Sequence, residues 1–262
     1  MKLLIAIPSK GRADTIFKRT LRWVVRTGFD VRIFVEPQDL KAYREGAKDA
    51  NYQNYTAIKP EQFVSILKND QGLDYVRRFV KRYAIKNGYD LVFKMDDDVL
   101  RFNGRGRNKP DDEMIVDFAV MVGKCRKAFG RYKDVGAIGF PYRNELFTVQ
   151  EWAGINMRLQ SCYIIKPDFI TEGFNHFDDF ADYMNIRKQN KVTLRYGLMG
   201  QDLADVGKNR GGLQMFDREA LQDEAIPKLR EMHPSLQFKA VKGKSWSIEP
   251  ILAGEFFGVK KL

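Results

Sequence analysis

The chain has 262 residues, and its 45 Lys and Arg against 34 Asp and Glu give it a formal net charge of +11. Apolar residues make up 44% of the chain and aromatic residues 13%, which excludes a disordered protein and supports a sizeable core. Two cysteines and two histidines exclude a disulfide framework and an HExxH metal site, so any metal would be bound mainly by carboxylates, which suit Mg²⁺ or Mn²⁺. The N-terminal apolar run ends at Pro8, and no run reaches the roughly 18 residues of a membrane span. These features predict a cytoplasmic protein with no membrane partner.

Strand and helix patterns alternate along the first half of the chain, beginning with an apolar strand at residues 3–7. Further strands are predicted at residues 31–37, 55–60 and 90–95, and helices at 13–28, 37–48 and 72–87. Gly28 stands where a C-cap glycine belongs, at the end of the first helix. This alternation is typical of an α/β fold with a mainly parallel sheet.

The second half continues the pattern and then loses it. Helices are predicted at 111–130, 177–191 and 217–234, strands at 135–140 and 161–166, and a loop at 200–214, before a basic tail. No internal repeat and no low-complexity linker interrupts the chain. We therefore predict a single domain over residues 1–262.

Three carboxylates, Asp96, Asp97 and Asp98, stand side by side in the sequence FKMDDDVLRF. They follow a predicted buried strand, at the end where ligands bind in open α/β sheets. Crowded carboxylates repel one another and raise one another's pKa, and a divalent cation relieves this repulsion. The sequence therefore predicts a metal site here, with a solvated acidic turn as the alternative.

The segments IAIPSKGR and FVEP, an Arg-rich helix and LVFKMDDDV together resemble the nucleotide-sugar half of GT-A glycosyltransferases, over about residues 1–195. The resemblance implies a GT-A (Rossmann-like) α/β/α sandwich with a mainly parallel central sheet, in which the acidic triplet is the DxD motif. Residues 1–110 would form the nucleotide-sugar-binding half. Residues 111–262 would form the acceptor-binding half and the basic tail.

The same resemblance assigns the donor site. Asp98 and Asp96 would bind Mn²⁺ or Mg²⁺ at the diphosphate of a UDP-sugar, and Asp96 would also face the nucleotide. The other residues that would bind the nucleotide sugar are Ile7, Pro8, Ser9, Arg12, Glu36, Asp97 and Gly154, the last at the turn of an acceptor loop. Trp152 beside that glycine could stack on a sugar or could be a core aromatic.

Two acidic residues in FDDFADYMNIRKQNK resemble the segment that carries the catalytic base in inverting members. A base is needed because the acceptor hydroxyl must lose its proton as it attacks. We favour Asp182 and keep Asp179 as the second choice, the alternative being helix carboxylates that satisfy the dipole. His233 is a candidate metal or phosphate ligand, with His176 a weaker one, although a lone histidine is often structural.

Basic residues cluster with glycines in three segments: Arg105 and Arg107, Lys208 and Arg210, and Lys242 and Lys244. Glycine lets the backbone approach a phosphate, and Lys and Arg supply the charge. Each cluster alone could be a solvated surface. Together, the three clusters predict a polyanionic partner.

Among GT-A proteins, a compact basic chain with IPSKGR and KMDDDV most resembles the TET-associated glycosyltransferases of bacteriophages. The resemblance implies metal-dependent transfer of a sugar, with UDP-glucose as the first donor to test, to the hydroxymethyl group of 5-hydroxymethylcytosine in double-stranded DNA. A phage enzyme would act in the cytoplasm of the bacterial host. The sugar, the stereochemical outcome, base flipping and the oligomeric state stay open.

Three alternatives remain from the sequence. A GT-A glycosyltransferase for a polysaccharide or protein acceptor would share the donor site but bind DNA weakly. A non-catalytic DNA-binding module would need neither metal nor nucleotide sugar. A nucleotidyltransferase also uses paired carboxylates and a divalent ion.

Overall fold

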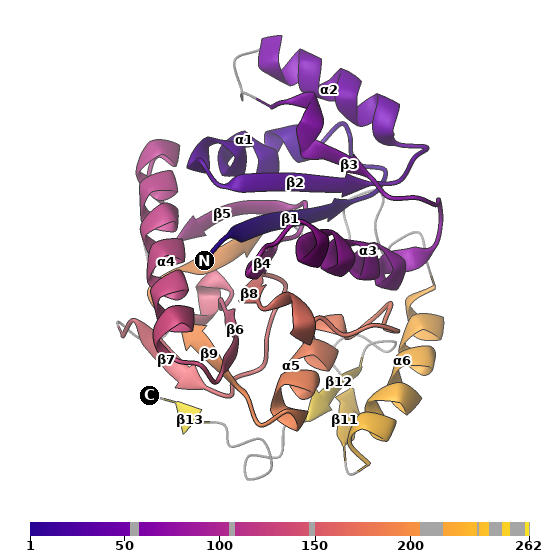
Figure 1. Ribbon diagram of the computed structural model, residues 1–262, viewed down its shortest axis with the longest axis vertical. Helices are drawn as coiled ribbons and strands as arrows, with labels where there is room; N and C mark the ends of the chain where they lie inside the picture. Colours follow the sequence, from indigo (N-terminus) through magenta and orange to yellow (C-terminus); the bar gives the residue numbers. More distant parts are fainter. Residues whose placement is uncertain are drawn as a thin grey trace.

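Nine strands form one mixed sheet through the middle of the molecule (Figure 1). The computed structural model describes residues 1–52, 58–104, 108–146, 150–204, 217–234, 236–240, 248–251 and 260–261. The order across the sheet is β13 (Lys260–Lys261), β7 (Trp152–Ile155), β9 (Val192–Tyr196), β6 (Val135–Gly139), β8 (Tyr163–Ile165), β4 (Leu91–Lys94), β1 (Leu3–Ser9), β2 (Asp30–Val35) and β3 (Phe63–Ser65).

All strands of this sheet except β8 and β7 run in the direction of β1. The ends of β1, β4 and β6 therefore meet at one edge, which we call the carboxyl-terminal edge. Because β8 lies antiparallel between β4 and β6, its first residues reach the same edge. This arrangement brings segments that are distant in sequence into one place.

Side chains of the sheet alternate between two cores, as a strand period of two requires. In β1, Leu3, Ile5 and Ile7 enter one core, and Leu4 and Ala6 enter the other. The first core is covered by α1 (Thr20–Val24), α2 (Leu40–Tyr52) and α4 (Asp111–Arg131), and the second by α3 (Gly72–Lys86), α5 (Asp178–Lys188) and α6 (Arg218–Met232) (Figure 1). The predicted α/β/α sandwich with a mainly parallel sheet is confirmed, and both predicted halves of the chain contribute strands to the one sheet.

The helix predicted at residues 13–28 is broken. The structure has the short α1 between two single turns of 3₁₀ helix, Ile16–Lys18 and Val25–Thr27. Side chains of α1 bond to carbonyls outside the helix, so tertiary contacts override helix propensity here. Gly28 ends the segment at φ 76°, which confirms its predicted role as a cap.

Several strands were not predicted. An antiparallel pair, β5 (Val99–Asn103) with β10 (Gly200–Leu203), replaces the start of the predicted loop at 200–214. The first half of the strand predicted at 55–60 lies outside the described residues, no strand is present at 58–60, and β3 lies further along the chain. β7 and β9 were also missed, and the basic tail contains the pair β11 (Gln237–Ala240) and β12 (Ile248–Ile251). These short strands are defined by their pairing partners, which a local pattern does not reveal.

Both cysteines, Cys125 in α4 and Cys162 at the start of β8, are free thiols that are fully buried. Burial raises the pKa of each thiol well above its ordinary value. None of the described helices is both long enough and apolar enough to cross a membrane.

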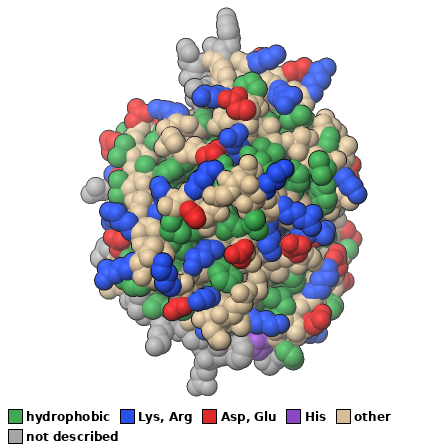
Figure 2. Space-filling model, viewed as in Figure 1, with side chains coloured by type: hydrophobic (Ala, Val, Ile, Leu, Met, Phe, Trp, Pro, Cys, Tyr) green, Lys and Arg blue, Asp and Glu red, His purple; other side chains and the backbone are tan. Residues whose placement is uncertain are grey.

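Charged side chains of both signs are interspersed over the face seen in Figure 2. Many of the cations pair with nearby acids, as Arg101 does with Asp111 at 2.6 Å and Lys124 with Glu151 at 2.7 Å. The excess of positive charge is therefore partly neutralised among the described residues.

The small residue Gly136 in β6 is required by the helix that packs over it. A Cβ at this position would meet Ile186 of α5 at 2.8 Å. We expect Gly136→Ala to destabilise the fold by about 1–3 kcal/mol through overpacking. Gly123→Ala in α4 is the matched control, because nothing lies within 4 Å of the added Cβ. This control is expected to stabilise by about 0.5–1 kcal/mol. Urea unfolding measures both, and equal effects of the two changes would contradict this account of the packing.

Candidate active site

The acidic turn follows β4 directly at the carboxyl-terminal edge. Its backbone is fixed by α1, whose Thr20 hydroxyl donates to the carbonyl of Asp96 at 3.1 Å and whose Trp23 indole donates to that of Val99 at 3.2 Å. The amide of Ala204, just after β10, donates to the carbonyl of Asp98 at 2.9 Å. The turn is therefore held by contacts from distant parts of the chain.

Asp97 is turned inward and is engaged by residues of the β1 loop. Its carboxylate pairs with Arg12 and accepts a hydrogen bond from Ser9 at 2.5 Å, and the Ser9 hydroxyl also bonds Tyr43 at 2.6 Å. Burial raises the pKa of Asp97 to about 6, although Arg12 and Ser9 oppose the shift. Asp97 thus anchors the β1 loop to the acidic turn.

Asp96 and Asp98 are the accessible carboxylates of the turn. Asp96 is exposed, yet desolvation by surrounding protein is the first cause that raises its pKa to about 7, followed by the charges of Asp98 and Asp97. Asp98 is mostly buried and lies 3.6 Å from Arg12.

This pair fits a divalent cation in part. Two mutually repelling carboxylates suit Mg²⁺ or Mn²⁺, which usually takes only one or two protein carboxylates and fills its other positions with water and phosphate oxygens. Within the described residues, no group of three or more His, Cys, Asp or Glu side chains is arranged to hold a metal ion by itself. Asp97 does not fit as a ligand, because Arg12 and Ser9 already engage it.

Other residues predicted for the donor lie along the ends of β1 and β2. Glu36 is buried and accepts from Lys10 at 3.0 Å and from Gln38 at 2.7 Å. Pro8 is half-buried at the end of β1, whereas Ile7 is fully buried in the core. Ser9 and Arg12 therefore contact the acidic turn through Asp97, and Glu36 contacts the β1 loop through Lys10.

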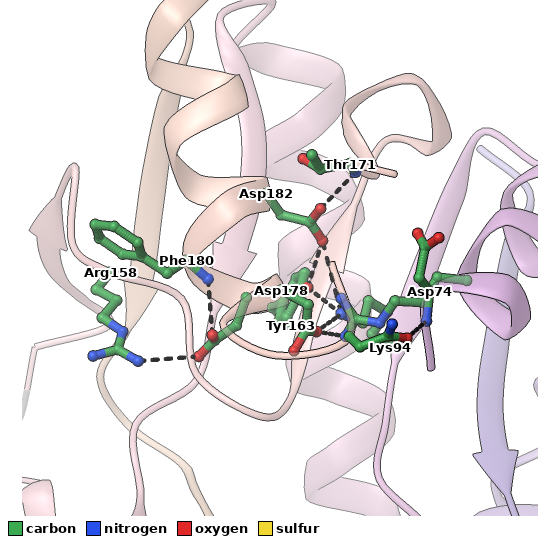
Figure 3. Close-up of polar contacts among 11 residues, drawn as sticks. Asp74, Lys94, Arg158, Tyr163, Thr171, Asp178, Phe180 and Asp182 are labelled. Atoms are coloured by element: carbon green, nitrogen blue, oxygen red, sulfur yellow. Dashed lines mark hydrogen bonds and ion pairs between the residues drawn. The ribbon is translucent and has the colours of Figure 1, made fainter. Parts of the chain in front are cut away.

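Asp182 lies in a buried ionic cluster beneath the acidic turn, formed by Arg77, Lys94, Tyr163, Asp178 and Asp182 (Figure 3). Its carboxylate accepts from the Tyr163 hydroxyl at 2.5 Å and from the amide of Thr171 at 2.6 Å. Lys94 lies 3.7 Å from Asp182. Asp182 is 0% exposed, so its carboxylate is enclosed by these protein partners.

The remaining cluster contacts fix the start of α5. Asp178 accepts from Lys94 at 2.9 Å and pairs with Arg77, and Lys94 also donates to Tyr163. Burial is the main cause that lowers the pKa of Lys94 to about 7, and the charge of Arg77 lowers it further. The sequence analysis missed Lys94 and Arg77, although a lone lysine in an apolar strand is a signal that buried acids lie nearby.

Asp179 is a partly exposed acid in the first turn of α5. It accepts from the amide of Phe180 at 2.8 Å and lies 3.7 Å from Arg158, and a fifth of its side chain is exposed. Figure 3 shows Arg158 and Phe180 on the side of the α5 start away from Lys94 and Asp182. Asp179 therefore differs from Asp182 in both exposure and partners.

The structure describes three further residues that the sequence analysis singled out. Gly154 is not at a turn but inside β7, where it pairs with Arg195 of β9 and Lys261 of β13, so the predicted turn was wrong, and the binding of the nucleotide sugar by Gly154 stays a prediction. Trp152 packs on Tyr196 with ring centroids 5.6 Å apart, as a core aromatic does. His233 caps the C-terminal end of α6, and its role as a ligand stays a prediction.

The six basic residues predicted to contact nucleic acid, Arg105, Arg107, Lys208, Arg210, Lys242 and Lys244, all lie outside the described residues. His176 is described, and it packs on Phe177 with ring centroids 4.3 Å apart.

The architecture is the predicted α/β/α sandwich with a mainly parallel sheet, and the acidic turn lies at the carboxyl-terminal edge beside the β1 loop. The model of the TET-Associated Glycosyltransferase family matches residues 3–202. The chain belongs to this family, which confirms the resemblance drawn from its motifs.

Solved structures with similar folds include S. aureus TarS 1–349 in complex with UDP-GlcNAc, at 12% identity and a TM-score of 0.49, over 88% of this chain and 65% of that one. An apo UDP-glucose pyrophosphorylase matches at 12% identity and a TM-score of 0.45, over 88% of this chain and 99% of that one. A197 from STIV matches at 12% identity and a TM-score of 0.42, over 78% of this chain and 86% of that one. This chain spans less than two thirds of TarS 1–349. A comparison with curated proteins found no match.

Proposed function

We propose that this chain transfers a sugar from a UDP-sugar to the hydroxymethyl group of 5-hydroxymethylcytosine in DNA. The observation that carries the proposal is the pair of neighbouring carboxylates Asp96 and Asp98 in the turn after β4, at the carboxyl-terminal edge, in a chain that belongs to a glycosyltransferase family. The net charge of +11 suits a polyanionic acceptor.

In this proposal, the donor lies at the ends of β1 and β4. Asp96 and Asp98 would hold Mn²⁺ or Mg²⁺, which when bound neutralises charge on the diphosphate. Ser9 and Arg12 engage Asp97, which leaves the two flanking carboxylates as the candidate ligands. The fixed backbone of the turn means that little reorganisation is needed when the donor binds.

We further propose that Asp179, rather than Asp182, is the base that accepts the proton of the acceptor hydroxyl. A base must come within hydrogen-bond reach of that proton. Asp179 is partly exposed at the start of α5, whereas both oxygens of Asp182 are engaged inside the core. The sequence analysis favoured the opposite order.

Transfer of label from UDP-glucose with Mn²⁺ to two duplexes, one with 5-hydroxymethylcytosine and one with cytosine only, tests the function. We expect label on the first duplex alone and a loss of about 100- to 1,000-fold in Asp98→Ala, because an electrostatic contact to the reacting group is removed. Asp134→Ala is the matched control. Asp134 is exposed in the turn before β6, and its carboxylate forms a surface ion pair with the Lys191 ammonium group at 2.7 Å.

The other outcomes separate the alternatives. Hydrolysis of UDP-glucose without label on either duplex would contradict the DNA acceptor and favour a polysaccharide or protein. DNA binding that ignores both UDP-glucose and Asp98→Ala would contradict catalysis and favour a DNA-binding module.

A further inference from the structure

Two hydroxyl side chains, those of Tyr142 and Ser161, lie at the carboxyl-terminal edge beside the acidic turn. Tyr142 follows the end of β6, and Ser161 precedes the start of β8. Across the sheet, β6, β8 and β4 are consecutive neighbours, and β8 is antiparallel to both of the others. The two residues are therefore adjacent to Asp96 on the side away from β1, where the donor is proposed to bind.

The position of Tyr142 is fixed by several contacts. Its hydroxyl and that of Ser161 are 3.0 Å apart, and its amide donates to the side chain of Gln160 at 3.1 Å. Gln160 in turn donates to Glu145 at 2.8 Å, and the backbone of Tyr142 pairs with Gln201 of β10. Tyr142 and Ser161 are each only half-buried, so both residues of this fixed pair are in contact with solvent.

Tyr142 also lies within electrostatic reach of both acids that the proposed function uses. Burial is the main cause that raises the pKa of Tyr142 to about 12, and the charges of Asp96 and Asp179 raise it further, while Ser161 opposes the shift. The phenol therefore stays protonated at neutral pH and can donate a hydrogen bond.

We infer that the hydroxyls of Tyr142 and Ser161 bind the acceptor and hold its reactive hydroxyl group next to Asp179. This inference rests on the proposed function and deepens it, because it assigns the acceptor to the β6 and β8 side of Asp96. The pair suits a hydroxyl-bearing acceptor, since each member can both donate and accept. Tyr142 is thus a specificity-determining residue, and Ser161 orients its hydroxyl.

The test compares the wild type with Tyr142→Phe and Ser161→Ala, which remove one hydroxyl each and keep the surrounding packing. Tyr132→Phe is the matched control, because Tyr132 is exposed at the end of α4. Calorimetry gives the Kd for UDP-glucose, transfer kinetics give KM for the 5-hydroxymethylcytosine duplex, and thermal unfolding verifies the fold. We expect Tyr142→Phe to raise KM for the duplex about three- to tenfold, the range of one hydrogen bond. Ser161→Ala should raise it less, and the Kd for UDP-glucose should stay within about twofold in both.

A weaker Kd for UDP-glucose with an unchanged KM for the duplex would overturn the inference and place the pair at the donor. No change in either quantity would also overturn it and leave the pair structural. If the wild type transfers no sugar, the proposed function fails, and hydrolysis of UDP-glucose in water then tests the pair separately. An acceptor contact predicts the same hydrolysis rate in wild type and Tyr142→Phe, and a lower rate in the variant would contradict it.

Discussion

Replacing Asp182 with alanine is expected to lower the free energy of unfolding by about 3–5 kcal/mol, the typical cost of breaking a buried ion pair. The ionic cluster contains two cations, Arg77 and Lys94, and two carboxylates, those of Asp178 and Asp182. Removing Asp182 leaves one positive charge in excess inside the protein. It also removes the carboxylate that accepts hydrogen bonds from the Tyr163 hydroxyl and the Thr171 amide. Chemical denaturation followed by circular dichroism measures the loss.

Asp182→Asn gives a finer comparison, because asparagine keeps the volume and can still accept from the Thr171 amide. We expect Asp182→Asn to lower the free energy of unfolding by less than Asp182→Ala does. Asp179→Ala on the same helix is the control for stability, since Asp179 is partly exposed and is expected to cost about 1 kcal/mol or less. An Asp182→Ala protein as stable as the wild type would contradict a structural role for this cluster.

The same Asp179→Ala variant is expected to lose about 100- to 10,000-fold in kcat for sugar transfer, the range for removal of a general base. The affinity for UDP-glucose should be unchanged, because Asp179 starts α5 while the proposed donor residues follow β1 and β4. Single-turnover transfer to the hydroxymethylated duplex measures the chemical step directly.

Asp179→Asn is the informative companion, as it preserves the bond from the Phe180 amide but cannot take a proton. An equal loss in both variants supports proton transfer at this carboxylate. Full activity of Asp179→Asn would reject Asp179 as the base. The pair of acids on α5 thus predicts two separate phenotypes, one in stability at Asp182 and one in rate at Asp179.

The sequence patterns located the acidic turn but could not distinguish these two acids. Alternating apolar strands and amphipathic helices identified the sandwich, and an apolar run placed Asp96 and Asp98 at its edge, because both signals are local. The burial of Asp182 in α5 depends on Lys94 of β4 and Tyr163 of β8. No spacing within α5 encodes those partners.

Tyr142 and Ser161 were missed for a related reason. Neither belongs to a charged cluster or a recognisable motif, and they meet only because β8 inserts in reverse between β4 and β6. A pattern read along the chain predicts that strands exist but not their order. Residues whose role depends on sheet order become visible only in the folded chain.

The burial of both thiols gives the protein a practical property for spectroscopy. Maleimide reagents attack the thiolate, and a buried thiol with a raised pKa offers little of it. Cys125 and Cys162 are both in this state. A cysteine introduced on the surface would therefore carry a fluorophore selectively, and the native pair could remain in place while that fluorophore tests the proposed binding of DNA.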